Sequence, residues 1–175
     1  MTAVMISCDV QQCVGCRMCE VACSDSHFGA VSPALSRIRV AKLEEIGIDL
    51  AIACLGCAEK PCLECSVDAL TVGANGEICL DRENCIACEE CVGRCPIGAI
   101  GSDQGLPLFC DLCGGTPRCV EVCPSDALVD ERDGEPSLEL FLEAKGTPAQ
   151  KRAHYAGVRS GPVRERWLGG WRLEP

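Results

Sequence analysis

Sixteen of the 18 cysteines in this 175-residue chain fall into four groups with short, regular gaps. Groups one and three have the spacing C-x2-C-x2-C-x3-C, group two has C-x2-C-x4-C-x2-C, and group four has C-x2-C-x5-C-x3-C. Closely spaced thiols of this kind are ligands for metal ions or metal clusters. In chain order the four groups are Cys13, Cys16, Cys19 and Cys23; Cys54, Cys57, Cys62 and Cys65; Cys85, Cys88, Cys91 and Cys95; and Cys110, Cys113, Cys119 and Cys123.

Groups one and three have the spacing of bacterial ferredoxins, whose cysteines bind [4Fe–4S] clusters. Two-residue gaps supply three thiolates to one cluster, and the fourth cysteine, beyond a turn, ligates the other cluster of a pair. Pro96 and Pro124, which follow groups three and four, help to fix that turn. Zinc ribbons use C-x2-C pairs separated by longer loops, and disulfides are rare in a reducing cytosol, so both are poorer matches. We expect four [4Fe–4S] clusters, with three as the alternative.

Group two departs from this spacing. Only two residues separate Cys62 from Cys65, and Ser66 stands where groups three and four have proline. An alanine followed by an apolar residue comes shortly after groups two, three and four. When the groups are aligned on this alanine, Ala69 in group two, Cys65 corresponds to the final cysteine of groups three and four. The sequence leaves open whether Cys65 or Cys79 completes the fourth cluster, or whether that cluster is absent.

Short strands are expected beside the clusters, at residues 4–7, 37–42 and 77–80, with a hairpin turn at residues 74–77. One helical turn is expected after Cys19 and another after Cys91. Residues 24–50 form an insertion between groups one and two, either a structural loop or a docking surface. Cys8 and Cys79, outside the groups, are predicted to be buried thiols in strands.

The chain divides by charge into a body, residues 1–136, and a tail, residues 137–175. The body holds 22 acidic and 9 basic residues, whereas the tail holds 4 acidic and 7 basic residues. The tail also holds four of the six aromatic residues, including both tryptophans. We expect a short helix at its start, a second from residue 147 to 156, and irregular structure from 157 to 175. The tail either folds back over the body or docks a partner subunit. Tryptophan, tyrosine and arginine are common at protein interfaces, and their presence in the tail favours the partner.

Other kinds of site are not indicated. The net charge of −10 argues against nucleic-acid binding. The two histidines, His27 and His154, lack metal-ligand spacing and are expected to be structural or exposed, and no nucleotide-binding loop or Ser–His–Asp set is evident. No apolar run is long enough to insert into a membrane, and the N-terminus resembles no export signal, which predicts a cytoplasmic protein. Clusters without a substrate site indicate a non-catalytic electron-transfer protein.

The order of the groups, together with three segments, resembles one family. The segments are residues 19–24 (CEVACS), 33–38 (PALSRI) and 110–115 (CDLCGG). The family comprises the electron-transfer subunits of tungsten-dependent aldehyde oxidoreductase-type enzymes, including the small iron–sulfur subunit of class II benzoyl-CoA reductase. The resemblance covers about residues 3–130. It implies an α+β, ferredoxin-like fold of two interleaved two-cluster modules with a C-terminal extension, one module from groups one and four and the other from groups two and three.

The resemblance also implies partners and a cross-paired ligand scheme. The chain would relay electrons to or from a large tungstopterin catalytic subunit, with a further redox subunit or a soluble ferredoxin as a possible second partner. The alternative partner is a hydrogenase, a carbon monoxide dehydrogenase, a formate dehydrogenase or another molybdopterin oxidoreductase. The four implied ligand sets are set A, Cys13, Cys16, Cys19 and Cys123; set B, Cys110, Cys113, Cys119 and Cys23; set C, Cys54, Cys57, Cys62 and Cys95; and set D, Cys85, Cys88, Cys91 and Cys65.

Overall fold

The computed structural model describes residues 5–131, 138 and 140–170 of the chain. This part is a small mixed α/β fold with four two-stranded antiparallel sheets. The strands are β1 (Met5–Cys8), β2 (Arg39–Leu43), β3 (Ile48–Ile52), β4 (Leu70–Val72), β5 (Ile78–Leu80), β6 (Gly101–Asp103), β7 (Leu106–Leu108) and β8 (Leu128–Glu131). The α-helices are α1 (Met18–Phe28), α2 (Glu90–Arg94), α3 (Arg118–Glu121) and α4 (Pro148–Gly170). Four single-turn helices lie between them, η1 (Pro33–Leu35), η2 (Glu44–Ile46), η3 (Pro61–Leu63) and η4 (Leu112–Gly115).

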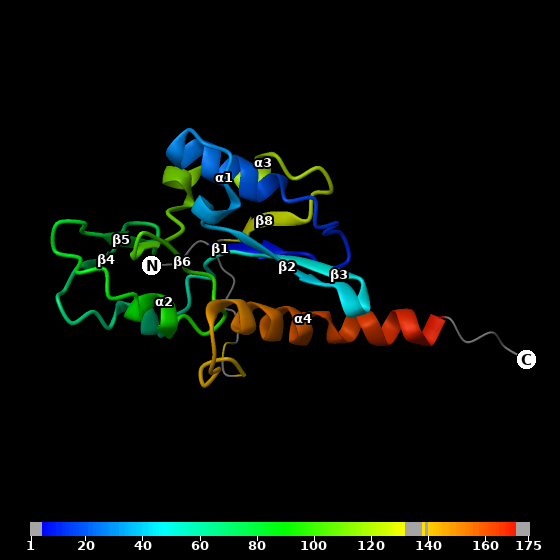
Figure 1. Ribbon diagram of the computed structural model, residues 1–175. Helices are drawn as coiled ribbons and strands as arrows, with labels where there is room; N and C mark the ends of the chain where they lie inside the picture. Colours follow the sequence, from blue (N-terminus) through cyan, green and yellow to red (C-terminus); the bar gives the residue numbers. More distant parts are fainter. Residues whose placement is uncertain (1–4, 132–137, 139, 171–175) are drawn as a thin grey trace, which may run out of the picture.

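The first and last strands of the body pair with each other. In the β1–β8 sheet Met5 lies opposite Glu131, and Cys8 lies opposite Leu128. Because β1 leads into cysteine group one and β8 follows group four, this pairing brings the two groups together. Helices α1 and α3, one from each group, pack side by side above the sheet (Figure 1).

The insertion between groups one and two forms part of the core. Strands β2 and β3 make a hairpin in which Arg39 lies opposite Ile52. Ile38, Leu50 and Ile52 are each at most 2% exposed. Burial of these apolar side chains stabilises the hairpin, so the insertion is a structural hairpin. Its first strand, predicted at residues 37–42, begins two residues later, at Arg39.

The β4–β5 hairpin confirms the predicted turn. The Gly73 amide donates to the Glu77 carbonyl oxygen at 2.8 Å, and Val72 lies opposite Ile78. A second small hairpin, β6–β7, follows group three. These hairpins and α2 lie together at the left of Figure 1, around groups two and three.

Helix α4 corrects the prediction of an irregular segment after residue 156. It continues to Gly170, although Pro162 lacks the amide that would bond to the Val158 carbonyl. Tyr155, Ala156 and Val163 are buried, and α4 packs against β2 and β3 (Figure 1). Tertiary packing therefore overrides the low helix propensity of the Gly- and Pro-containing sequence.

The short helix expected at the start of the tail is a single turn in the described residues. The amides of Phe141 and Leu142 both donate to the Leu138 carbonyl, at 2.8 and 3.0 Å. Phe141 then packs edge-on against Tyr155, with ring centroids 5.0 Å apart. The predicted boundary at residues 136/137 and the tail residue Trp171 lie outside the described residues.

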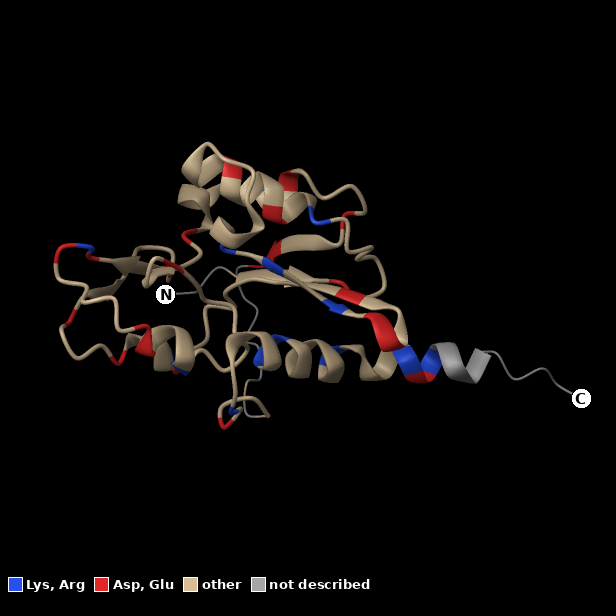
Figure 2. Ribbon diagram, viewed as in Figure 1, with Lys and Arg blue, Asp and Glu red and all other residues tan. Residues whose placement is uncertain are grey.

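Basic residues recur along α4, whereas acidic residues are spread over the loops, helices and strands of the body (Figure 2). Among the described residues, no helix is both long enough and apolar enough to span a membrane.

Candidate iron–sulfur sites

The four cysteine groups begin with the same backbone conformation. In each group the residue directly before the second cysteine is left-handed: Gly15 has φ +62°, Gly56 +58°, Ala87 +54° and Leu112 +56°. Such values are unfavourable for residues with a Cβ, and such strain gathers at functional sites. The four C-x-x-C segments therefore curl in the same way, including the segment of the irregular group two.

The turns after the last cysteine of groups two, three and four also match. The third residue after that cysteine is left-handed in each, with φ +51° at Asp68, +65° at Gly98 and +51° at Asp126. Group two thus makes the same turn without the proline found in the other two. This places Cys65 at the position that Cys95 and Cys123 occupy in their own groups.

Two small cavities bring together the cysteines of sets A and D. One, of about 20 Å³, is lined by Cys13, Cys16, Cys19 and Cys123. The other, also of about 20 Å³, is lined by Cys65, Cys85, Cys88 and Cys91. In both, three thiols come from one C-x2-C-x2-C run, and the fourth comes from a distant segment.

Cys79 lies on β5, is exposed, and does not line the set D cavity. The prediction that Cys79 is buried is therefore wrong, because its side chain points away from the core in the short β4–β5 hairpin. Cys8 is buried as predicted, and a hydrogen bond from the Cys8 thiol lowers the pKa of Cys13.

The thiols of set B lie near one another, with Cys23 on α1, Cys113 on η4, Cys119 on α3 and Cys110 in the loop before η4. Burial, together with the neighbouring Cys23 and Cys113, raises the pKa of the Cys119 thiol to about 12. The Arg37 amide donates to Cys23 Sγ at 3.3 Å. Cys23 thus belongs spatially with group four, although it is part of group one in the sequence.

Set C shows the same crossing between groups two and three. Burial raises the pKa of Cys62 to about 12, with further contributions from Cys54, Cys57 and Cys95. The Ala99 amide donates to Cys95 Sγ at 3.2 Å. Amide bonds to a ligand sulfur are a recognised influence on cluster potential.

The four sets follow one another in space. Burial raises the pKa of Cys19, and Cys119 contributes, so set A adjoins set B. Burial also raises the pKa of Cys110 well above its ordinary value, and Cys54 is the second cause, so set B adjoins set C. Between sets C and D, η3 packs against α2, and Arg94 forms an ion pair with Glu64.

Asp111, between two cysteines of group four, is the centre of a polar network that the sequence analysis did not identify. Its Oδ1 accepts the Cys113 amide at 3.0 Å and the His27 Nε2 at 2.9 Å, and its Oδ2 pairs with the Arg37 guanidinium. His27 Nδ1 donates to the Cys23 carbonyl oxygen at 2.7 Å. Burial opposes the charged form, but bonds from Arg37 and His27 hold the pKa of Asp111 below its ordinary value.

The beginning of α4 is bonded to the loop that carries Cys95. The buried Lys151 Nζ donates to the carbonyl oxygens of Gly93 and Cys95, at 2.6 and 3.3 Å. Arg152 donates to the Gly98 carbonyl at 2.7 Å. A Cβ at Gly98 would collide with the Pro148 carbonyl oxygen, so this approach needs glycine.

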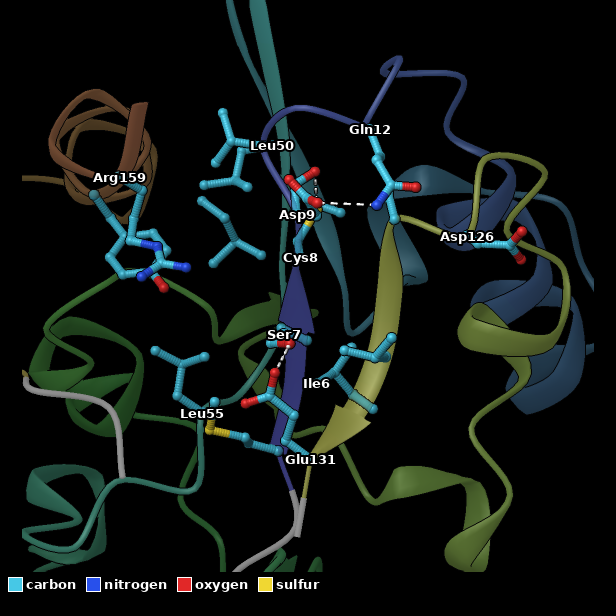
Figure 3. A pocket seen from close by; sticks show the side chains of 18 of the residues that line it. Ile6, Ser7, Cys8, Asp9, Gln12, Leu50, Leu55, Asp126, Glu131 and Arg159 are labelled. Atoms are coloured by element: carbon cyan, nitrogen blue, oxygen red, sulfur yellow. Dashed lines mark hydrogen bonds between the residues drawn. The ribbon is translucent and has the colours of Figure 1, made fainter. Parts of the chain in front are cut away.

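A hollow of about 720 Å³ lies between β1, β3 and α4 (Figure 3). Its lining combines apolar side chains such as Ile6, Leu50 and Leu55 with the polar Glu131 and Arg159. Cys8 is its one cysteine among the described residues, so it is distinct from sets A to D.

No family model matches the chain, but several curated proteins do. The polyferredoxin-like subunit of aliphatic sulfonate oxidoreductase from Pyrococcus furiosus is 43% identical over 116 residues, covering 64% of this chain and 66% of that protein. The putative electron transport protein YsaA of Escherichia coli is 39% identical, covering 69% and 84%. The thiosulfate reductase electron transfer subunit PhsB of Salmonella typhi is 30% identical, covering 89% and 86%.

Among solved structures, the active-site complex of benzoyl coenzyme A reductase with benzoyl-CoA contains a chain that is 30% identical. The TM-score is 0.46, and the alignment covers 82% of this chain and 88% of that one. YsaA is named as a putative electron transport protein, and PhsB as an electron transfer subunit of a reductase. This chain belongs to the family of polyferredoxin-like iron–sulfur electron-transfer subunits of oxidoreductase complexes.

Proposed function

We propose that sets A to D each hold one [4Fe–4S] cluster and that electrons pass along them in the order A, B, C, D. The observation that carries this proposal is the crossing of groups, in which Cys123, Cys23, Cys95 and Cys65 each lie with three cysteines of another group. The donors fit the clusters, because four thiolates are the usual ligands of a [4Fe–4S] cluster. When bound, the clusters supply one-electron chemistry, and the chain holds them in place and in order.

The fold would then consist of two interleaved two-cluster modules. Sets A and B use only groups one and four, which the β1–β8 pairing holds together. Sets C and D use only groups two and three, which lie with the β4–β5 and β6–β7 hairpins (Figure 1). The approach of Cys54 to Cys110 supports an electron path between the modules.

Electrons would enter and leave at the two ends of this series. Cys16 of set A and Cys88 of set D are exposed. Val14 and Ile86, each in the loop beside one of these cysteines, are 63% and 61% exposed. Exposed apolar residues next to a terminal cluster provide a contact point for a redox partner.

A Cys23→Ser variant tests the crossing directly. Loss of Cys23 should disturb the cluster of set B and leave that of set A, so the reduced-state EPR spectrum should lose or alter one component of four. The matched variant Cys79→Ser changes an exposed thiol outside the sets and should retain all four components. A Cys23→Ser protein whose disturbed cluster is instead ligated by Cys13, Cys16 and Cys19 would contradict the crossed scheme.

The catalytic partner, we propose, is a large tungstopterin subunit, as in the family that residues 19–24, 33–38 and 110–115 resemble. Anaerobic co-purification through a tag on this chain, followed by metal analysis, tests that partner. Tungsten in stoichiometric amount with the large subunit is the expected result, whereas a complex without tungsten would contradict it. Molybdenum instead of tungsten would favour a formate dehydrogenase or another molybdopterin oxidoreductase as the partner. The similarity to the formate dehydrogenase iron–sulfur subunit of Wolinella succinogenes, 36% identical over 127 residues, supports this alternative.

The division into a body and a partner-docking tail stays a proposal. Helix α4 packs on the body through Tyr155 and Val163, so docking would involve the residues beyond this contact. A chain ending at residue 166 should keep its clusters but lose co-purification with the catalytic subunit. Co-purification in undiminished yield would contradict a docking role for residues 167–175.

A further inference from the structure

Asp111 joins three separate segments around set B. Its carboxylate bonds the Cys113 amide within its own loop, His27 near the end of α1, and Arg37 before β2. The same two partners also reach Cys23, because His27 Nδ1 donates to its carbonyl oxygen and the Arg37 amide donates to its Sγ. Asp111 is thus connected to Cys23 by two routes, each through one residue.

This connection links parts of the ligand set that are far apart in the sequence. Cys23 and Asp111 are separated by 88 positions, yet set B needs Cys23 beside Cys110 and Cys113. The His27 and Arg37 side chains in the network are 11% and 18% exposed, so the two donors are largely shielded from water, whereas the Asp111 side chain is 42% exposed. Bonds of charged groups in such surroundings are stronger than exposed ones.

The network also places a defined charge beside set B. Both nitrogens of His27 lie within hydrogen-bond distance of acceptors, the Cys23 carbonyl and the Asp111 carboxylate. The Asp111 carboxylate and the Arg37 guanidinium are the charged pair of this network. Removing the carboxylate charge would favour the reduced cluster, because reduction adds negative charge.

We propose that Asp111 is a positioning residue that holds Cys23 against the Cys110–Cys113 loop and sets the retention and potential of one cluster, that of set B. This inference rests on the proposed function, because it assumes a cluster at set B. It goes beyond the cysteine ligands by assigning to one non-cysteine residue an effect confined to one of four clusters. Outer residues that orient ligands are a general feature of metal sites.

Asp111→Asn is the informative variant. Asparagine keeps the shape and the oxygen that accepts from the Cys113 amide and from His27, but its amide nitrogen stands in place of Oδ2 and cannot accept from Arg37, and the carboxylate charge is lost. In the full chain, purified without oxygen, one of four clusters should shift to higher potential in an EPR-monitored redox titration. The same cluster should lose its iron, about four atoms per chain, several-fold faster to an iron chelator.

Glu121→Gln is the matched control. It removes an acid next to Cys119 whose ion pair with Arg118 stays within α3 and joins no separate segments. All four chelation rates should match the unmodified chain, and its potentials give the baseline for loss of a carboxylate charge near set B without loss of a connection between segments. An Asp111→Asn protein that behaves like this control would overturn the proposal.

A second variant covers the case in which Asp111→Asn does not fold. Arg37→Gln removes one crossing partner and keeps the Asp111–Cys113 turn, so the same single cluster should lose iron faster, in smaller measure than in Asp111→Asn. Because this variant removes a cation rather than a carboxylate, the potential of that cluster should shift lower. Four unchanged clusters in Arg37→Gln would then overturn the proposal. An unmodified chain without iron would instead refute the proposed function, which keeps the two failures distinguishable.

Discussion

Ala87 and Leu112 hold the same left-handed backbone, with φ +54° and +56°, each directly before the second cysteine of its group. At the equivalent positions of the other two groups stands glycine, Gly15 and Gly56, for which this conformation carries no Cβ penalty. The fold therefore keeps one loop shape in all four groups even where the side chain opposes it. A requirement of the site, rather than local propensity, explains this agreement.

The strain at Ala87 can be relieved or increased. Ala87→Gly should keep the cluster of set D and leave stability unchanged or raise it by up to about 1 kcal/mol. Ala87→Val should destabilise the loop, because a β-branched side chain disfavours this conformation, and Gly105 packs close to the Ala87 methyl group. Thermal unfolding and iron content measure both effects. A valine variant with the iron content and stability of the glycine variant would refute this interpretation.

Cys65 and Cys79 should behave differently on substitution. Cys65→Ser removes a thiol from the set D cavity and should abolish or destabilise one cluster, with loss of about four iron atoms per chain. Cys79→Ser changes an exposed thiol on β5 and should leave the iron content unchanged. Iron and sulfide analysis of the two variants, purified in parallel, checks this. The reverse pattern would make Cys79 the ligand.

Lys151 should stabilise the contact between α4 and the loop of Cys95. Lys151→Met keeps the apolar stem but leaves the Gly93 and Cys95 carbonyls without the ammonium donor, which should lower the free energy of unfolding by about 1–3 kcal/mol. Lys145→Met, at an exposed position, is the matched control and should change stability little. Chemical unfolding of both variants gives the comparison, and equal stabilities would show that these two bonds contribute nothing.

The parts of the fold that follow from local chemistry could be predicted from the sequence. The hairpin at Gly73–Glu77 depends on turn residues between apolar ones, and it forms as expected. The strand starting at Leu128 follows the predicted alanine–leucine ending. The end of α4 could not be predicted, because its helix depends on burial of Tyr155 and Val163 against strands about 100 positions away.

The same limit applies to the candidate sites. Cysteine spacing identifies the groups, but the positions of Cys23 near Cys119 and of Cys65 near Cys88 depend on how distant segments pack. The role of Asp111 is equally non-local, since its partner His27 has no spacing that marks a site. A carboxylate between two ligand cysteines, as in Cys110–Asp111–Leu112–Cys113, is the one sequence signal that could have indicated it.

The most direct test of the account is the iron and acid-labile sulfide content of the full chain, purified without oxygen and analysed together with its zinc content. Four [4Fe–4S] clusters predict about sixteen iron and sixteen sulfide per chain, a brown colour, and EPR signals of interacting clusters after reduction. A colourless protein that contains zinc and no sulfide would contradict the account.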